Sequence, residues 1–195
     1  MKLLSSILTS LIVFTSCTKK EQRVFTINLP HYSSKIEFDK LNNFDTLIVW
    51  NWYNDNMASH RRCYRLQNSK LGIIMEKGML PKKAEYFDQM TIVTPIKPNK
   101  FPSWTISKWL IGNKEIYLSD RPSDEIFKFD SLTIDNKKFA VFGIKTMDVE
   151  TKVIYMTNIS NESIEFEFYT NLQSKDSFYL KSLNMMKTIK IKHYR

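Results

Sequence analysis

The residue types best suited to nucleophilic chemistry lie in one short segment, His60-Arg61-Arg62-Cys63-Tyr64-Arg65. The thiolate is the reactive form of cysteine, and neighbouring arginine and histidine side chains lower a thiol pKa. Such a Cys/His pair could serve a thiol-dependent enzyme. A single cysteine in an alternating segment is more often a small buried apolar residue, however. We therefore expect Cys63 to be buried, and we predict no catalytic residue.

Metal and phosphate chemistry are also disfavoured by the sequence. The three histidines, His31, His60 and His193, are far apart, and no pair has the spacing of metal ligands. No G-x-S-x-G motif is present to support a serine nucleophile. With only 4 glycines in the chain, a glycine-rich phosphate loop is hard to build. The expectation is a non-enzymatic protein with no cofactor and no metal.

A second group of residues suits binding to another protein. Trp and Tyr are common in binding hot spots, and arginines beside them could form an anion- or partner-binding patch. The candidates for this role are Trp50, Trp52, Tyr53, Arg61, Arg62 and Arg65. The alternative is that the aromatic rings, with Trp104 and Trp109, fill the core, because each ring buries a large apolar area. The sequence favours the core for these rings.

Strands must position most of these residues. Residues 44–53 alternate with apolar side chains on both faces, which predicts a strand covered on both sides. In a strand over residues 62–67, Cys63 and Arg65 share one face, and Arg62, Tyr64 and Leu66 share the other. Further strands are predicted over 24–29 (ended by Pro30), 36–38, 71–76, 90–94 and 115–118. Residues 103–111 suit either a short helix or a strand that ends at Gly112-Asn113.

The last third of the chain has the clearest pattern. Strands are predicted over residues 131–134, 138–146, 153–159 and 163–170, with turns such as Asp135-Asn136 between them. In the fourth of these strands Glu165, Glu167 and Tyr169 alternate with apolar residues, which predicts one buried and one polar face. Ser174 is a suitable N-cap for a helix to about Lys187, followed by a strand over 188–192. The predicted buried stripe of that helix is Tyr179, Leu183 and Met186.

This order of elements predicts an α+β fold: a single domain over residues 24–195, mostly antiparallel sheet with a C-terminal amphipathic helix packed on one face. A β-sandwich-like fold is the alternative. Over roughly residues 130–192 the pattern resembles the C-terminal part of Mog1/PsbP-like domains. That resemblance implies a binding or assembly module and transfers no site residue.

The first residues are typical of an export signal. Lys2 precedes an uncharged, largely apolar run from Leu3 to Phe14, which is too short to span a bilayer but suits a signal peptide. Phe14-Thr15-Ser16-Cys17 resembles the bacterial lipoprotein signal, with Phe14 where leucine is usual. The resemblance implies a signal peptide over 1–16, acylation of Cys17 and a lipidated tether over 17–23. With no acidic residue directly after Cys17, the periplasmic face of the outer membrane is the expected location.

Composition narrows the function further. The formal charge is +9, but lysine dominates and only six of the 29 basic residues are arginine. Base and phosphate recognition relies on arginine forks, so we expect no nucleic-acid partner. The leading hypothesis is an envelope lipoprotein that binds a protein partner and attaches to the membrane through Cys17. The alternatives are an immunity lipoprotein that neutralises a toxin and, less favoured, a thiol-dependent enzyme.

Overall fold

The computed structural model describes nine stretches of the chain: residues 24–39, 44–53, 61–68, 88–96, 105–120, 123–146, 150–159, 162–171 and 174–194. The predicted signal peptide, Cys17 and the tether lie outside these residues. So do His60, Trp104 and the strand predicted over 71–76.

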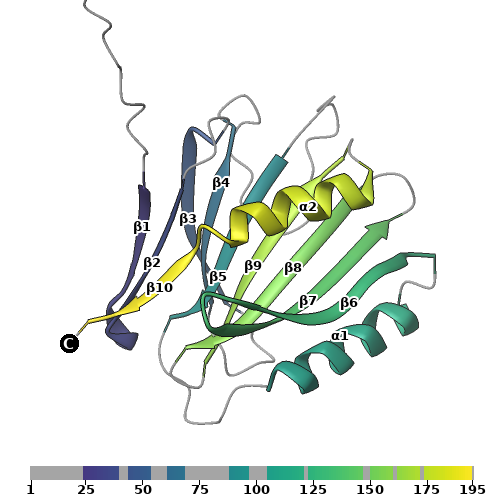
Figure 1. The fold of residues 1–195 in the computed structure, drawn as a ribbon, viewed down its shortest axis with the longest axis horizontal. Coiled ribbons are helices and arrows are strands. Elements are labelled where there is room, and N and C mark those ends of the chain that lie inside the picture. Colours follow the sequence, from purple (N-terminus) through teal and green to yellow (C-terminus); the bar gives the residue numbers. More distant parts are fainter. Residues whose placement is uncertain are drawn as a thin grey trace, which may run out of the picture.

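The larger of two sheets is antiparallel throughout. Its described strands follow the spatial order β3-β4-β5-β9-β8-β7-β6, as Figure 1 shows. They are β3 (Thr46–Trp52), β4 (Arg61–Gln67), β5 (Asp88–Pro95), β6 (Glu125–Ile134), β7 (Lys137–Thr146), β8 (Glu150–Ile159) and β9 (Glu162–Thr170). The predicted Asp135-Asn136 turn joins β6 to β7, and both residues have positive φ values, 47° and 60°. This suits the primed two-residue turns that match strand twist.

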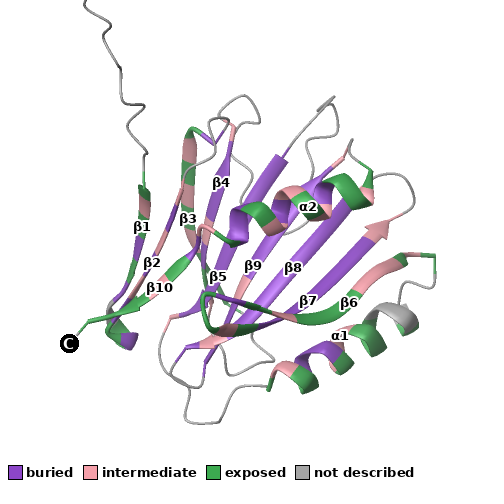
Figure 2. Cartoon of the chain, viewed as in Figure 1, coloured by how far each residue is buried: buried purple, intermediate pink, exposed green. Residues whose placement is uncertain are grey.

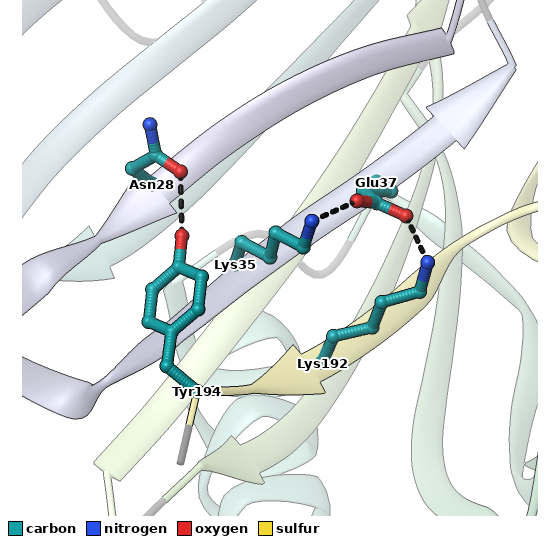
Figure 3. Close-up of polar contacts among 5 residues, drawn as sticks. All are labelled: Asn28, Lys35, Glu37, Lys192 and Tyr194. Atoms are coloured by element: carbon teal, nitrogen blue, oxygen red, sulfur yellow. Dashed lines mark hydrogen bonds and ion pairs between the residues drawn. The ribbon is translucent and has the colours of Figure 1, made fainter.

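The smaller sheet has the order β1-β2-β10 and joins the two ends of the described chain. It consists of β1 (Val24–Leu29), β2 (Ser34–Asp39) and β10 (Lys190–His193), and the short 3-10 helix η1 (Pro30–Tyr32) connects the first two. β1 ends before Pro30, as predicted. On this sheet Glu37 lies between Lys35 and Lys192, and the Tyr194 hydroxyl donates to Asn28 Oδ1 over 2.6 Å (Figure 3). Hydrogen bonds from Lys192 and then Lys35 lower the pKa of Glu37 to about 2.

The main core lies between the larger sheet, the smaller sheet and helix α2 (Lys175–Met186). We call this side of the larger sheet the α2 face. Its buried residues include Leu66, Met90, Phe166 and Phe168 from the larger sheet. Ile36 and Phe38 from the smaller sheet join the same core. In Figure 1 α2 crosses the larger sheet, and the smaller sheet lies at the β3 end.

The predicted α2 stripe is only partly correct. The N-cap is confirmed, since Ser174 Oγ accepts a hydrogen bond from Ser177 N. The buried residues are Phe178, Ser182, Met185 and Met186, whereas Tyr179 and Leu183 are half-buried beside the core. The buried face of α2 includes Ser182, and a polar residue is not counted in an apolar periodicity, so the pattern did not predict this face. Here its Oγ lies 2.9 Å from the Tyr155 hydroxyl and donates to Tyr179 O, so burial leaves no unmet hydrogen bond.

Helix α1 (Ile106–Asp120) covers part of the opposite side, the α1 face. For residues 103–111 the helix alternative is correct and the strand ending at Gly112-Asn113 is not, because α1 begins at Ile106 and continues through Gly112-Asn113. The strand predicted over 115–118 is wrong, because the same helix includes these residues. Gly and Asn cost helix stability only modestly, and packing against a sheet outweighs that cost. Trp109 and Leu110 pack on Phe142 and on neighbouring β7 and β8 residues.

The fold is thus mostly antiparallel sheet with two described helices, one of them near the C-terminus, which agrees with the α+β prediction. The second sheet stacked on the α2 face is also compatible with a sandwich-like description. β6 is longer than predicted: it begins at Glu125, and a register shift between Ile126 and Lys128 interrupts its pairing. Directly opposite this irregularity lies Gly143, where a Cβ atom would come 2.7 Å from Phe127 Cε2.

Candidate functional site

The six candidate partner-binding residues lie on or next to two adjacent strands. β3 pairs with β4 so that Trp50 lies opposite Cys63 and Trp52 opposite Arg61. Cross-strand partners in an antiparallel pair have side chains on the same face. The arrangement therefore brings aromatic rings and arginines together on the α1 face, at the end of the sheet that α1 does not cover.

The three arginines do not form one patch, however. Strand alternation places Arg61 and Arg65 on the α1 face and Arg62 on the α2 face, as the sequence predicted for Arg62 and Arg65. Arg61 donates to the carbonyl and hydroxyl oxygens of Ser163 over 3.4 and 3.3 Å. Arg62 is exposed and lies 5.7 Å from the centre of the Tyr64 ring. The three arginines therefore do not lie on one surface, because strand alternation separates Arg62 from Arg61 and Arg65.

The Arg65 side chain is buried and therefore cannot contact a partner at the surface. Its side chain is 1% exposed, its Nε donates to Thr91 Oγ1 over 2.9 Å, and its guanidinium lies 5.0 Å from the centre of the Trp50 ring. Burial lowers the pKa of Arg65, and the charge of Glu167 opposes that change. In the sheet register, Arg65, Thr91 and Glu167 form one cross-strand row. The charge of Arg65 is thus compensated inside the protein.

Glu167 and Tyr169 contradict the predicted polar face of β9. Glu167 is 0% exposed and Tyr169 is 2% exposed, and the Tyr169 hydroxyl donates to Glu167 Oε2 over 2.6 Å. Burial, and then the charge of Glu167, raise the pKa of Tyr169 well above its ordinary value. Alternation predicts which side chains share a face, but it cannot show that both faces are covered. A buried glutamate beside a buried arginine leaves no signal in a single sequence.

Cys63 is a buried thiol in the same part of the α1 face, between Trp50 and Val93 in the register. Its burial confirms the expectation from alternation. Among the described histidines, His193 Nδ1 lies 2.7 Å from Ser34 Oγ and is far along the chain from Cys63. The part of the chain with described side chains contains no cluster of three or more metal-ligating residues.

The β3 end of the sheet is the exposed part of this region. β3 is the terminal strand of the described sheet, and Leu47, Val49 and Trp52 are 39%, 41% and 45% exposed. Tyr53, directly after the strand, is 59% exposed. The prediction that this strand is covered on both sides is therefore wrong. Its apolar residues lie at a sheet edge, as the pink and green strand beside the purple central strands of Figure 2 shows.

The core alternative for the aromatic residues holds for Trp109 but not for Trp52. Trp109 is buried, packs edge-on against Phe142 with ring centres 6.5 Å apart, and donates from Nε1 to Glu165 Oε1 over 3.4 Å. Trp50 is half-buried over Arg65. The structure thus separates one core tryptophan from a strand edge with exposed rings.

Comparisons with known proteins assign the chain to no family. No family model matches the chain, and no curated protein is similar to it at a significant level. The resemblances to bacterial lipoproteins and to Mog1/PsbP-like domains therefore stay predictions. None of the described helices has both the length and the apolar character required to cross a membrane.

Proposed function

We propose that this protein is a non-enzymatic lipoprotein of the bacterial cell envelope that binds an extended, acidic segment of a partner protein along β3. Cys17 carries the lipid and the periplasmic face of the outer membrane is the location. The observation that carries the binding part of the proposal is the position of β3, which ends the described sheet and exposes Leu47, Val49 and Trp52. In this proposal the domain is an α+β module with α2 packed on one face of its sheet.

An extended partner suits this edge because of backbone hydrogen bonding. A terminal strand presents N–H and C=O groups that a further strand can pair with, and alternate side chains then give specificity. No described strand pairs with the outer edge of β3. A partner side chain on one face would meet Leu47 and Val49, and one on the other face would meet Trp50 and Trp52.

An acidic partner suits the charge of the same strands. β3 contains no charged residue, and the charged residues of β4 are all arginines: Arg61, Arg62 and Arg65. Arg65 is internal, which leaves Arg61 and Arg62 near the surface, one on each face. Complementary charge steers association and discriminates between partners. The formal charge of +9 adds a general preference for acidic partners.

The proposal is tested with the full-length acylated protein as bait in native envelope extracts. A photo-crosslinking residue at Val49 should capture a partner, and the crosslinked peptide should be an acidic segment. Val49→Pro removes a backbone donor and adds a ring at the edge, and Trp52→Ala removes an anchor, so each should reduce capture at least roughly tenfold.

Leu180→Ala is the matched control, because Leu180 is an exposed apolar residue that belongs to α2 and not to the β3 edge. It should leave capture unchanged. Equal capture by Val49→Pro, Trp52→Ala and Leu180→Ala would reject the β3 edge as the binding site. A crosslinked segment without acidic residues would reject the charge argument. Mass spectrometry of native protein with Cys17 unmodified would reject the lipid anchor.

A further inference from the structure

The smaller sheet begins where the proposed lipid tether ends. Val24, the first residue of β1, follows Cys17 by seven positions, and an extended chain of that length spans at most about 25 Å. A compact domain of about 170 residues is roughly 40 Å across. The tether is therefore shorter than the domain, so the surface around Val24 stays near the bilayer that holds the lipid.

The register of the smaller sheet places the start of β10 beside this point. Val24 lies opposite Asp39, whose backbone N–H donates to Thr188 Oγ1 over 3.3 Å. Further along the same strands, Glu37 on β2 lies opposite Lys190 on β10. Neighbouring strands are about 4.8 Å apart, and β2 separates β1 from β10, so the backbone of Lys190 lies about 10 Å from β1.

Lysine is the commonest charged residue on the outward side of this sheet and at its junction with α2. Alternation turns Ile36 and Phe38 into the core and the residues between them outward. We call the following outward-facing charged residues the anchor-side surface: Lys35, Glu37, Asp39, Lys187, Lys190 and Lys192. Four lysines and two carboxylates give this surface a net charge of +2.

The lysines of the anchor-side surface are not all engaged within the protein. Glu37 forms ion pairs with both Lys35 and Lys192, as Figure 3 shows. Lys187 and Lys190 are exposed and line one groove beside β6. Neither of these two forms an ion pair with another residue in the described stretches. Their charges are therefore available to an anionic partner.

An anionic bilayer suits this surface better than a discrete ligand. The basic members of the anchor-side surface are all lysines, which are point charges without the fork that arginine offers to a single carboxylate or phosphate. A charged lipid surface attracts each basic side chain near it and requires no fixed geometry. Val24 and Tyr194, at the ends of the same sheet, are 54% and 44% exposed, and a tyrosine ring suits the headgroup region.

A modest charge is sufficient because the lipid already holds the protein at the bilayer. Docking of a tethered domain is an intramolecular step, and a short tether gives an effective concentration of about millimolar. The lysines therefore do not have to recruit the protein from solution. They only have to favour one orientation of the domain over the others.

From this arrangement we infer that the anchor-side surface lies on anionic phospholipid headgroups when Cys17 carries its lipid, an inference that rests on the lipid anchor of the proposed function. The smaller sheet and α2 pack on one face of the larger sheet, and α1 packs on the other. In the docked orientation the larger sheet therefore lies between the bilayer and α1, and α1 points away from the membrane.

The test compares two positions on the full-length acylated protein in vesicles. A bimane label at Thr26→Cys reports on the outward side of the smaller sheet, and one at Ile116→Cys reports on α1, where Ile116 is 55% exposed. Cys63 is buried and stays unlabelled in the folded protein. With a nitroxide-headgroup lipid as quencher, equal parts of phosphatidylcholine and phosphatidylglycerol should quench the Thr26→Cys label far more than the Ile116→Cys label. Phosphatidylcholine alone should remove most of that difference.

Charge variants test whether the lysines produce the orientation. Lys187→Gln combined with Lys190→Gln should lower the ratio of docked to undocked molecules roughly tenfold in vesicles that contain phosphatidylglycerol. Lys108→Gln combined with Lys138→Gln removes the same charge from exposed positions on α1 and β7, and it should leave that ratio unchanged. High salt should act on the wild type as the first pair of substitutions does.

Flotation of the protein with the vesicles reports the lipid anchor separately from docking. Protein that does not float would reject the anchor and this inference with it. Floating protein whose two labels are quenched equally would overturn the inference alone. Quenching at Thr26→Cys that does not respond to phosphatidylglycerol, or to loss of Lys187 and Lys190, would also overturn it and would leave binding at the β3 edge untouched.

Discussion

The two faces of the larger sheet are both well buried, but different forces hold them. On the α2 face the central strands contribute Met90, Ile92, Phe166 and Phe168 to one apolar core. On the α1 face the same strands contribute Arg65, Thr91, Glu167 and Tyr169, joined by hydrogen bonds and charge. The stability of an apolar face depends on how completely side chains fill the space. The stability of a buried polar face depends on whether each polar group keeps its hydrogen-bond or charge partner. The two faces should therefore respond differently to mutation.

Two adjacent residues of β9, one on each face, give the most direct test of this difference between the faces. Glu167→Leu removes a carboxylate that compensates the buried charge of Arg65 and leaves the Tyr169 hydroxyl without its acceptor, so it should lower the free energy of unfolding by about 3–5 kcal/mol. Phe166→Ala, one residue away on the α2 face, should cost about the same by creating a cavity. Adding Arg65→Met should recover the part of the Glu167→Leu loss that comes from the uncompensated charge of Arg65, but not the part that comes from the Tyr169 hydroxyl, which stays without its acceptor. It should recover none of the Phe166→Ala loss. Urea unfolding of the four variants measures this, and equal recovery in both backgrounds would contradict the distinction.

Gly143→Ala tests whether the packing of the α2 face tolerates one added methyl group. An alanine Cβ would lie 2.7 Å from Phe127 Cε2 and 2.9 Å from Lys128 Cβ, so the irregular start of β6 must shift. Overpacking of this kind costs about 1–3 kcal/mol. Thermal unfolding should show the loss, and Phe127→Leu should relieve part of it. A Gly143→Ala variant as stable as the wild type would mean that this edge of the sheet adapts freely.

The contact between Tyr155 and Ser182 tests whether a buried polar group on the apolar α2 face also needs its hydrogen-bond partner. Ser182 donates to Tyr179 O, so the Tyr155 hydroxyl donates to Ser182 Oγ. Ser182→Ala leaves that hydroxyl buried without an acceptor and should cost about 1–3 kcal/mol. Tyr155→Phe leaves Ser182 bonded to its backbone acceptor and should cost about 0.5–1.5 kcal/mol. Chemical denaturation gives both values, and the reverse order would contradict the assigned donor.

Glu37 should give the smallest effect, because its ion pairs lie at the surface of the smaller sheet. Its pKa is lowered from 4.5 to about 2 in the folded protein. The stabilisation is therefore present above pH 4.5 and is lost as the pH falls towards 2. Glu37→Gln should flatten that part of the stability curve at low salt, and high salt should remove most of the difference. An equally steep acid loss in Glu37→Gln would assign the effect to other carboxyl groups.

Features that depend on a few neighbouring residues are predicted correctly, and features that depend on distant packing are not. Local signals located β1 before Pro30, the Asp135-Asn136 turn and the Ser174 cap, because each depends on a few neighbouring residues. The alternation of β4 correctly separated Arg62 from Arg65. The sequence does not predict the helix over residues 112–118, because packing of the preceding turns on the sheet outweighs the local preference of Gly112-Asn113 for a chain break.

Alternation along single strands is enough to predict which side chains share a face and that the chain forms mostly antiparallel sheet. Which faces are covered depends on how the strands assemble: in the folded protein Trp52 is exposed and Arg65 is buried with Glu167. The difference arises because periodicity is a property of one strand. Burial and charge compensation, in contrast, depend on strands that are distant in sequence and become neighbours only when the sheets assemble.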